Sequence, residues 1–326
     1  MGGSIPGRIE TRASQALGIR YPIVQGGLAR IARAELAAAV SNAGGMGQIA
    51  VAGLEQPDRL RAEIRKAKRL TDAPFGINFP VGHLPIDALL DIALEEGVAA
   101  MSFTGGNPKP YIRRLEGTGI SILVLVSGPE QARKAEQAGA HVIATVGFEG
   151  GGHIGRSDLT TMVAVPLVVR AVSIPVLAGG GIADGRGLAA ALALGADGVE
   201  VGTRFIAVKE TFAHDNYKSA VVHANSEDTV VVKRTLGTPG RALANTWTDR
   251  ILAAEAEGQP REAVLGMVRA DANERGALAG DMDNSLVWVG QAAAMVQDVP
   301  AAQELIERMV GEARDAAQAV LGMMKE

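Results

Sequence analysis

Three short apolar runs between residues 141 and 205 each end in a cluster of glycines. HVIATV precedes GFEGGGHIG, IPVLA precedes GGGIADG, and DGVEV precedes GTRF. The segments between these runs, LTTMVAVPLVVRAV and RGLAAALALGA, have the length and composition of helices. Short apolar runs that alternate with helices are typical of β-α units in a parallel sheet. In such sheets the functional residues follow the carboxyl ends of the strands, where these glycine clusters stand.

The same pattern runs through the chain that precedes these three units. Apolar runs in YPIVQGGL, MGQIAVA, PFGINFP, AAMSFTGG and SILVLV are each followed by a segment with helical spacing, such as PDRLRAEIRKAKRLT or GPEQARKAEQAG. Eight β-α units in roughly 205 residues are the number expected of a closed (β/α)8 barrel. We therefore predict an α/β fold in which residues 1–208 form a TIM barrel.

The chain continues beyond the predicted barrel with less regular periodicity. Residues 209–284 are rich in polar residues and turn signals, and residues 285–326 end in the amphipathic segment AAQELIERMVGEARDAAQAVLGMM. A simple terminal extension is one interpretation. We favour a helical cap, formed by residues 209–284, that covers the active site. We expect the C-terminal helices of residues 285–326 to pack back on the barrel.

Composition excludes several classes of protein. The chain has no cysteine, which rules out disulfides, thiolate nucleophiles and zinc-thiolate sites. Lys and Arg number 32 against 36 Asp and Glu, without a basic block, so nucleic acid is not an expected partner. No apolar run has the roughly 20 residues that span a bilayer, and the N-terminus lacks the apolar region of a signal peptide. We expect a cytoplasmic enzyme with a small-molecule substrate.

Two of the glycine clusters occupy the place where barrels commonly bind phosphate. Gly179, Gly180 and Gly181 follow the seventh predicted strand, and Gly202 and Thr203 follow the eighth. Glycine lets the backbone approach an anion closely, and the Thr203 hydroxyl adds a hydrogen-bond donor. A single such glycine could simply form a tight turn. Two clusters on adjacent strands predict a phosphate site.

His153 is the candidate catalytic residue. It follows the sixth predicted strand within GGGHIG, where Gly151 and Gly152 leave the imidazole accessible to a ligand. Its ordinary pKa near neutrality suits it to donate or accept a proton. A purely structural histidine is the alternative. Among the other histidines only His83, after the third strand, lies on the same predicted face.

Amides end two further strands of the predicted barrel. Gln25, followed by Gly26 and Gly27, ends the first strand, and Asn78 ends the third. Side-chain amides at a strand end can bind the pyrimidine edge of a heteroaromatic ring such as a flavin, although ordinary loop capping is equally consistent with their type. No spacing typical of metal ligands, of a nucleophile elbow or of a dinucleotide-binding loop appears in its proper context.

Several of these pieces together resemble one family. YPIVQGG, AAAVSNAGGMG, FEGGGHIG, PVLAGGGIADGRG and ALGADGVEVGTRF are similar to motifs of the nitronate monooxygenase (2-nitropropane dioxygenase) superfamily. This superfamily of FMN-binding barrels also includes flavin-dependent enoyl-acyl-carrier-protein reductases and NADH:quinone reductases. The resemblance implies FMN, with its phosphate on Gly180, Gly181, Gly202 and Thr203. It places the isoalloxazine ring near Gln25, Gly26, Gly27 and Asn78, with His153 beside the flavin.

The branch of the superfamily decides the expected reaction. Oxidation of alkyl nitronates with O2 is the leading hypothesis. The alternative is an NAD(P)H-dependent reductase of enoyl thioesters or quinones, which the sequence Gln25-Gly26-Gly27-Leu28 resembles more closely. A phosphate-binding isomerase or aldolase without flavin is a third class. It usually relies on a catalytic lysine or on paired carboxylates within the barrel, and no lysine lies at the carboxyl end of a strand before Lys209. A homodimer is a further expectation.

Overall fold

Eight parallel strands form the centre of the molecule, and a computed structural model describes residues 7–82 and 84–324. The strands are β1 (Ile23–Gln25), β2 (Gln48–Ala50), β3 (Gly76–Pro80), β4 (Ala100–Thr104), β5 (Ser121–Val126), β6 (Val142–Val146), β8 (Val176–Gly179) and β9 (Gly198–Val201). They pair in the order β1-β9-β8-β6-β5-β4-β3-β2, and a bridge between Val24 and Met46 joins β1 to β2. This closure confirms the predicted (β/α)8 barrel. His83 lies outside the described residues.

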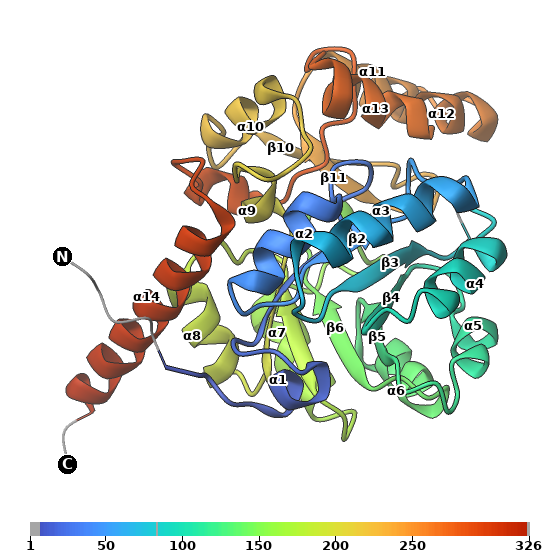
Figure 1. Ribbon diagram of the computed structural model, residues 1–326. Helices are drawn as coiled ribbons and strands as arrows, with labels where there is room; N and C mark the ends of the chain where they lie inside the picture. The colour runs from blue at the N-terminus through green and yellow to red at the C-terminus, as the bar shows by residue number, and fades with distance from the viewer. Residues whose placement is uncertain (1–6, 83, 325–326) are drawn as a thin grey trace.

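Helices alternate with the strands and surround the barrel (Figure 1). They are α2 (Ala34–Asn42), α3 (Pro57–Leu70), α4 (Asp87–Glu95), α5 (Lys109–Arg114), α6 (Pro129–Gln137), α7 (Thr161–Val169), α8 (Gly185–Ala193) and the short α9 (Thr203–Ile206). Helix α3 shows why such segments are helical. Pro57 opens its first turn, and Leu60, Ile64 and Ala67 recur on one buried face.

The amino end of the barrel is closed by helix α1 (Arg12–Leu17). Ala13 and Leu17 join barrel residues such as Val24, Leu123 and Leu177 in one buried cluster. The Thr11 side chain accepts the backbone N–H of Ser14, which caps the helix. Apolar side chains therefore fill the amino end of the barrel, and the opposite end, at the carboxyl ends of the strands, is left for a ligand.

A mixed α/β segment covers the carboxyl ends of the strands (Figure 1). It contains α10 (Asp215–Val222), β10 (Thr229–Val232), β11 (Gly240–Leu243), α11 (Thr246–Ala256), α12 (Arg261–Met267) and α13 (Ala270–Ala279). The two strands form an antiparallel sheet with β7 (Gly152–His153), which belongs to the loop after β6. Residues 209–284, predicted as helical, thus include strands that connect directly to the glycine-rich loop of the barrel.

The last residues return to the outside of the barrel. A 3-10 helix, η1 (Gln291–Met295), precedes the long helix α14 (Ala302–Met323). Helix α14 packs beside α8 and α2 in Figure 1, where Leu305, Ile306 and Met309 join their buried cluster. Of the helices in residues 7–82 and 84–324, none has both the length and the apolarity required to cross a bilayer.

Candidate functional site

A large cavity of about 1210 Å³ opens at the carboxyl ends of the barrel strands. Its wall includes Gly26 and Gly27 after β1, Asn78 on β3, the loop after β6 with His153, the glycines after β8 and the residues after β9. The covering segment contributes Tyr217, Trp288 and Gly290. Pockets for single small molecules usually measure about 300–1,000 Å³. This cavity therefore has room for a cofactor together with a substrate.

Backbone donors without partners line the part of this cavity next to β8 and β9. The N–H groups of Gly180, Gly181, Gly202 and Thr203 make no hydrogen bond to any residue in the described ranges. Thr203 begins helix α9, whose first N–H groups have no partner within the helix. Gly180 and Gly181 have φ of +91° and +73°, a conformation that glycine adopts readily. The arrangement forms a cradle for an anion such as phosphate.

In the neighbouring helix α7, the first backbone N–H already has a partner. Both carboxylate oxygens of Glu149 accept the backbone N–H of Thr161, at 3.0 and 2.9 Å. The Thr161 hydroxyl in turn donates to the carbonyl oxygen of Gly180 at 2.9 Å. Glu149 thus caps the first residue of α7, and Thr161 supports the loop that carries Gly180. Thr161 therefore does not add its N–H to the cradle after β8 and β9.

Gly27 and Asn78 form a second polar region of the cavity. A Cβ at position 27 would lie 2.2 Å from Oδ1 of Asn78, so only glycine leaves room for this side chain. The Asn78 Nδ2 donates to the hydroxyls of Ser102 and Thr104 at 2.9 and 3.0 Å. These bonds orient the amide so that its oxygen, which accepts none from the described residues, is available to a donor on a ligand.

Gln25 lies away from this cavity. It is fully buried, and its Oε1 accepts the backbone N–H of Gln48 at 2.9 Å. The Gln48 Nε2 returns a bond to the Gln25 carbonyl at 2.9 Å. The Gln25 side chain therefore joins β1 to β2, and it is absent from the described cavity wall. Gly26 and Gly27, the next two residues, do line the cavity.

His153 lies at the edge of the cavity on strand β7. Its ring is tilted by 36° against that of Trp288, with the ring centroids 5.8 Å apart. The backbone of β7 pairs with β11, where Gly240 is opposite His153. Gly151 and Gly152 line the same cavity, and a Cβ at position 151 would lie 2.4 Å from the backbone nitrogen of Gly290. The strand pairing and the close backbone approach fix the imidazole at an exposed position facing the cavity.

Trp288 belongs to a cluster that the sequence patterns did not indicate. Lys233 lies over its ring, with Nζ 5.2 Å from the centroid, and the Tyr217 hydroxyl donates to its carbonyl oxygen at 3.0 Å. Lys233 has a φ of +65°, which is rare for a residue with a side chain, and burial lowers its pKa to about 8. In the sequence, only the aromatic residue within VWVG could have indicated this cluster.

Glu200 is a further cavity residue that the sequence patterns did not indicate. It lies on β9, is 5% exposed and lines the cavity. Burial raises the pKa of its carboxyl group to about 7. An acidic residue within the apolar run GVEV could have been recognised, because an isolated charge in a buried strand is costly unless a partner or a function retains it.

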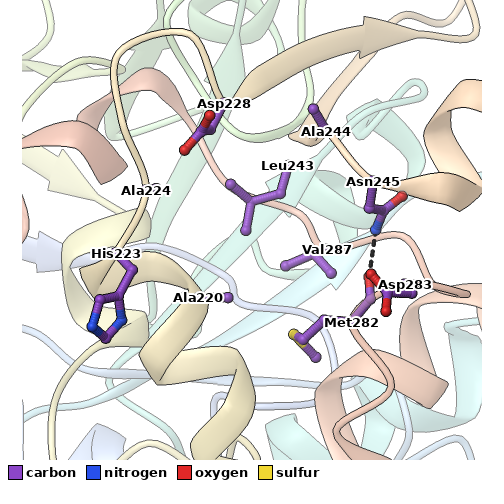
Figure 2. A pocket seen from close by; sticks show the side chains of 10 residues that line it. All are labelled: Ala220, His223, Ala224, Asp228, Leu243, Ala244, Asn245, Met282, Asp283 and Val287. Carbon is purple, nitrogen blue, oxygen red and sulfur yellow. Dashed lines mark hydrogen bonds between the residues drawn. The ribbon is translucent and has the colours of Figure 1, made fainter.

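A smaller cavity of about 190 Å³ lies within the covering segment (Figure 2). Figure 2 shows Asn245 turned toward Met282, and the Asn245 Nδ2 donates to the Met282 carbonyl at 2.6 Å. Asp228 in the same cavity accepts the backbone N–H of Asn225 at 2.7 Å. These polar groups serve local structure. In the part of the chain that the structure describes, no cluster of three or more potential metal ligands occurs here or elsewhere.

Comparisons with known proteins agree on one family. The family model described as nitronate monooxygenase matches residues 10–312. A nitronate monooxygenase of Pseudomonas aeruginosa is 35% identical, and the match covers 93% of this chain and 99% of that protein. The structure of FabK from Thermotoga maritima has a TM-score of 0.92 at 39% identity and covers 97% of this chain and 100% of its own.

A third relative has a different name. The (3aS,4S,5R,7aS)-5-hydroxy-7a-methyl-1-oxo-octahydro-1H-indene-4-carboxyl-CoA dehydrogenase of Mycobacterium tuberculosis is 32% identical, over 94% of this chain and 96% of that protein. Proteins that share this fold and nearly its full length thus carry several oxidoreductase names.

Proposed function

Because this chain belongs to the nitronate monooxygenase family, whose members are flavin-dependent oxidoreductases, we propose that it binds FMN and oxidises alkyl nitronates with O2. One observation carries the proposal. Four backbone N–H groups without partners in the described chain face the same cavity as His153. Membership of the family thus supports the class of reaction. The cavity supports it further, because it combines an anion cradle with a histidine at its edge.

The residues of the cavity suit the separate parts of FMN. Gly180, Gly181, Gly202 and Thr203 would hold the phosphate by their N–H groups. The available oxygen of Asn78 would accept a hydrogen bond from the ring, and Gly26 and Gly27 would allow the ring to approach β1. Gly179 forms the cavity wall beside the cradle, and Gly151 and Gly152 form the wall that carries His153.

The side chains near His153 would position the substrate. A bound flavin supplies the acceptor for the electrons of the nitronate and the donor to O2. A nitronate carries its negative charge on two oxygens, which an imidazole N–H can hydrogen-bond. His153 would hold or move a proton at one of these oxygens, and Trp288, tilted against its ring, would exclude water from the reacting carbon.

The cofactor assignment is tested by a pair of glycine variants. Gly181→Ala places a side chain at a φ of +73°, and the loop must shift or carry about 1–2 kcal/mol of strain. We expect its FMN affinity to fall by about tenfold, while riboflavin, which has no phosphate, binds as before. Gly97→Ala is the matched control, because Gly97 has a φ of +59° and lies at the opposite end of the barrel. Equal loss of FMN in both variants would remove the cradle from FMN binding.

The reaction is tested by anaerobic mixing of the FMN-loaded protein with a small alkyl nitronate and, separately, with NADH and NADPH. Loss of the oxidised flavin absorbance with the nitronate, followed by its return in air and formation of nitrite, is the expected result. Rapid loss with a nicotinamide and none with the nitronate would contradict the monooxygenase function and identify a reductase.

The size of the cavity favours one alternative, NAD(P)H-dependent reduction of an enoyl thioester or a quinone. A small nitronate occupies little of 1210 Å³. Arg156 and Arg269 lie on the cavity wall, where they could contact the phosphates of a nicotinamide or a thioester carrier. The anaerobic experiment separates the two functions. A homodimer and a cytoplasmic location stay predictions, and light scattering would measure the oligomeric state.

A further inference from the structure

Glu200 occupies the floor of the large cavity. The neighbouring residues Val199 and Val201 pack outward against the surrounding helices. Because side chains alternate along a strand, Glu200 faces the barrel interior. Its carboxyl lies beside Gly26, where a Cβ would be 3.4 Å from Oε1 of Glu200. Glu200 is 5% exposed and lines the cavity, so a ligand at the bottom of the cavity can contact it.

The carboxyl group of Glu200 has no partner in the described ranges. Three buried side-chain oxygens there lack a hydrogen bond, on Gln48, Thr145 and Glu200, and of these only Glu200 lines the cavity. No ion pair to Glu200 occurs among the described residues either. A buried carboxylate without a partner is strongly disfavoured, whereas the neutral acid keeps one O–H donor and acceptor capacity. The neutral carboxyl group can therefore complete its hydrogen bonding with an uncharged polar atom of a ligand.

The position of Glu200 in the sheet places it between the two halves of the anion cradle. It is in register with Gly179 on β8, which precedes Gly180 and Gly181, and it precedes Gly202 by two residues. A charged carboxylate here would repel a phosphate held by these residues. A neutral carboxyl group would instead bind the uncharged polar atoms that adjoin the phosphate.

We infer that Glu200 is a cofactor-binding residue whose neutral carboxyl group hydrogen-bonds the uncharged, non-phosphate part of the flavin. The inference rests on the proposed binding of FMN. It extends that proposal by dividing recognition between backbone N–H groups, which bind the phosphate, and one buried acid, which binds hydroxyl or ring atoms.

Two variants of similar length separate hydrogen bonding from packing. Glu200→Gln keeps a donor and an acceptor, whereas Glu200→Met keeps the length and loses both. Dissociation constants for FMN and for riboflavin are measured by quenching of flavin fluorescence with apoprotein, and thermal unfolding verifies that each variant is folded. We expect Glu200→Met to weaken both ligands by about tenfold, and Glu200→Gln to stay within about threefold of the parent.

The outcomes distinguish the two levels of the proposal. If the parent protein binds neither flavin, the proposed function fails. If the parent binds FMN and Glu200→Met binds both ligands as tightly as Glu200→Gln does, Glu200 has no role in binding. If Glu200→Met weakens FMN but leaves riboflavin unchanged, the carboxyl group acts on the phosphate and our assignment is wrong. Should Glu200→Met not fold, Glu200→Ala provides the same comparison.

Discussion

Two carboxylates at opposite ends of strand β9 have opposite environments. Asp197, just before the strand, accepts two bonds from the Arg12 guanidinium at 2.8 and 2.7 Å and one from the backbone N–H of Val176 at 3.0 Å. Glu200, three residues later, has neither a hydrogen bond nor an ion pair within the described chain. Both side chains are largely buried, so exposure does not account for the difference.

The difference follows from what each end of the barrel must do. At the amino end, Arg12 and the Thr11 hydroxyl both bond to Asp197 and hold helix α1 across the bottom of the barrel. The charged and polar groups around Asp197 are thus matched to one another, which helps to close this end of the core. At the carboxyl end Glu200 and the N–H groups of the cradle are left without partners in the described residues. Unsatisfied polar groups that line a cavity, as these do, indicate where a ligand binds.

The largest expected effect distinguishes the histidines at the two ends of β6. His153→Ala should leave FMN bound but reduce turnover by on the order of 10²-fold or more, because a group that holds or transfers a proton is lost. His141→Ala is the matched control, since the Nδ1 of His141 accepts the Ile122 backbone N–H at 3.1 Å at the opposite end of the barrel. Steady-state kinetics measures both variants. Turnover of His153→Ala equal to that of His141→Ala would exclude His153 from the mechanism.

The second-largest expected effect is a dependence of the protein's stability on pH, caused by ionisation of Glu200. Burial raises the pKa of this carboxyl group from 4.5 to about 7, so the native apoprotein keeps a proton that the unfolded chain has lost. Binding of this proton contributes about 3 kcal/mol to the free energy of unfolding. The contribution is complete below pH 4.5 and is lost as the pH rises to about 7. Urea unfolding of the apoprotein across this range should show the decline.

Glu200→Gln supplies the control for that experiment, because its amide does not ionise. The parent and the variant should differ in the slope of stability against pH between 4.5 and about 7. Parallel curves would show that Glu200 does not stay protonated in the native state.

The smallest effect concerns Asp197. Asp197→Ala removes the partner of Arg12 and leaves the Val176 N–H unsatisfied, so we expect a loss of about 2 kcal/mol in the free energy of unfolding. FMN affinity should not change, since Asp197 and the proposed FMN site lie at opposite ends of β9. Urea unfolding and fluorescence quenching measure the two quantities. A loss of flavin binding without a loss of stability would contradict the separation of the two ends.

Much of the fold could be predicted because it depends on repeated local patterns. Apolar runs followed by glycine and a helical segment identified the eight strands of the barrel, and the order of the strands follows from closure. The sequence also located the glycines after β8 and β9 that line the cavity. The strands β10 and β11 were not predicted, because they are short and pair with β7 only once the covering segment is folded.

The site shows where local patterns are insufficient. Gln25 ends β1, yet its side chain joins β1 to β2. Glu149 follows β6, yet its side chain caps the first residue of helix α7. Trp288 and Lys233 reach the cavity region from the last third of the chain, so no local spacing relates them to His153. Which polar group has a partner depends on contacts between segments distant in sequence.

The sequence by itself determined the barrel, the face that carries function and the glycines that leave backbone N–H groups accessible. These features depend on side-chain period and on the absence of a Cβ, which are properties of single residues and their neighbours. Only the tertiary structure decided that Asp197 is paired and Glu200 is not. Hydrogen bonding and desolvation depend on which groups the closed barrel brings together, and Arg12 lies 185 residues from Asp197 in the chain.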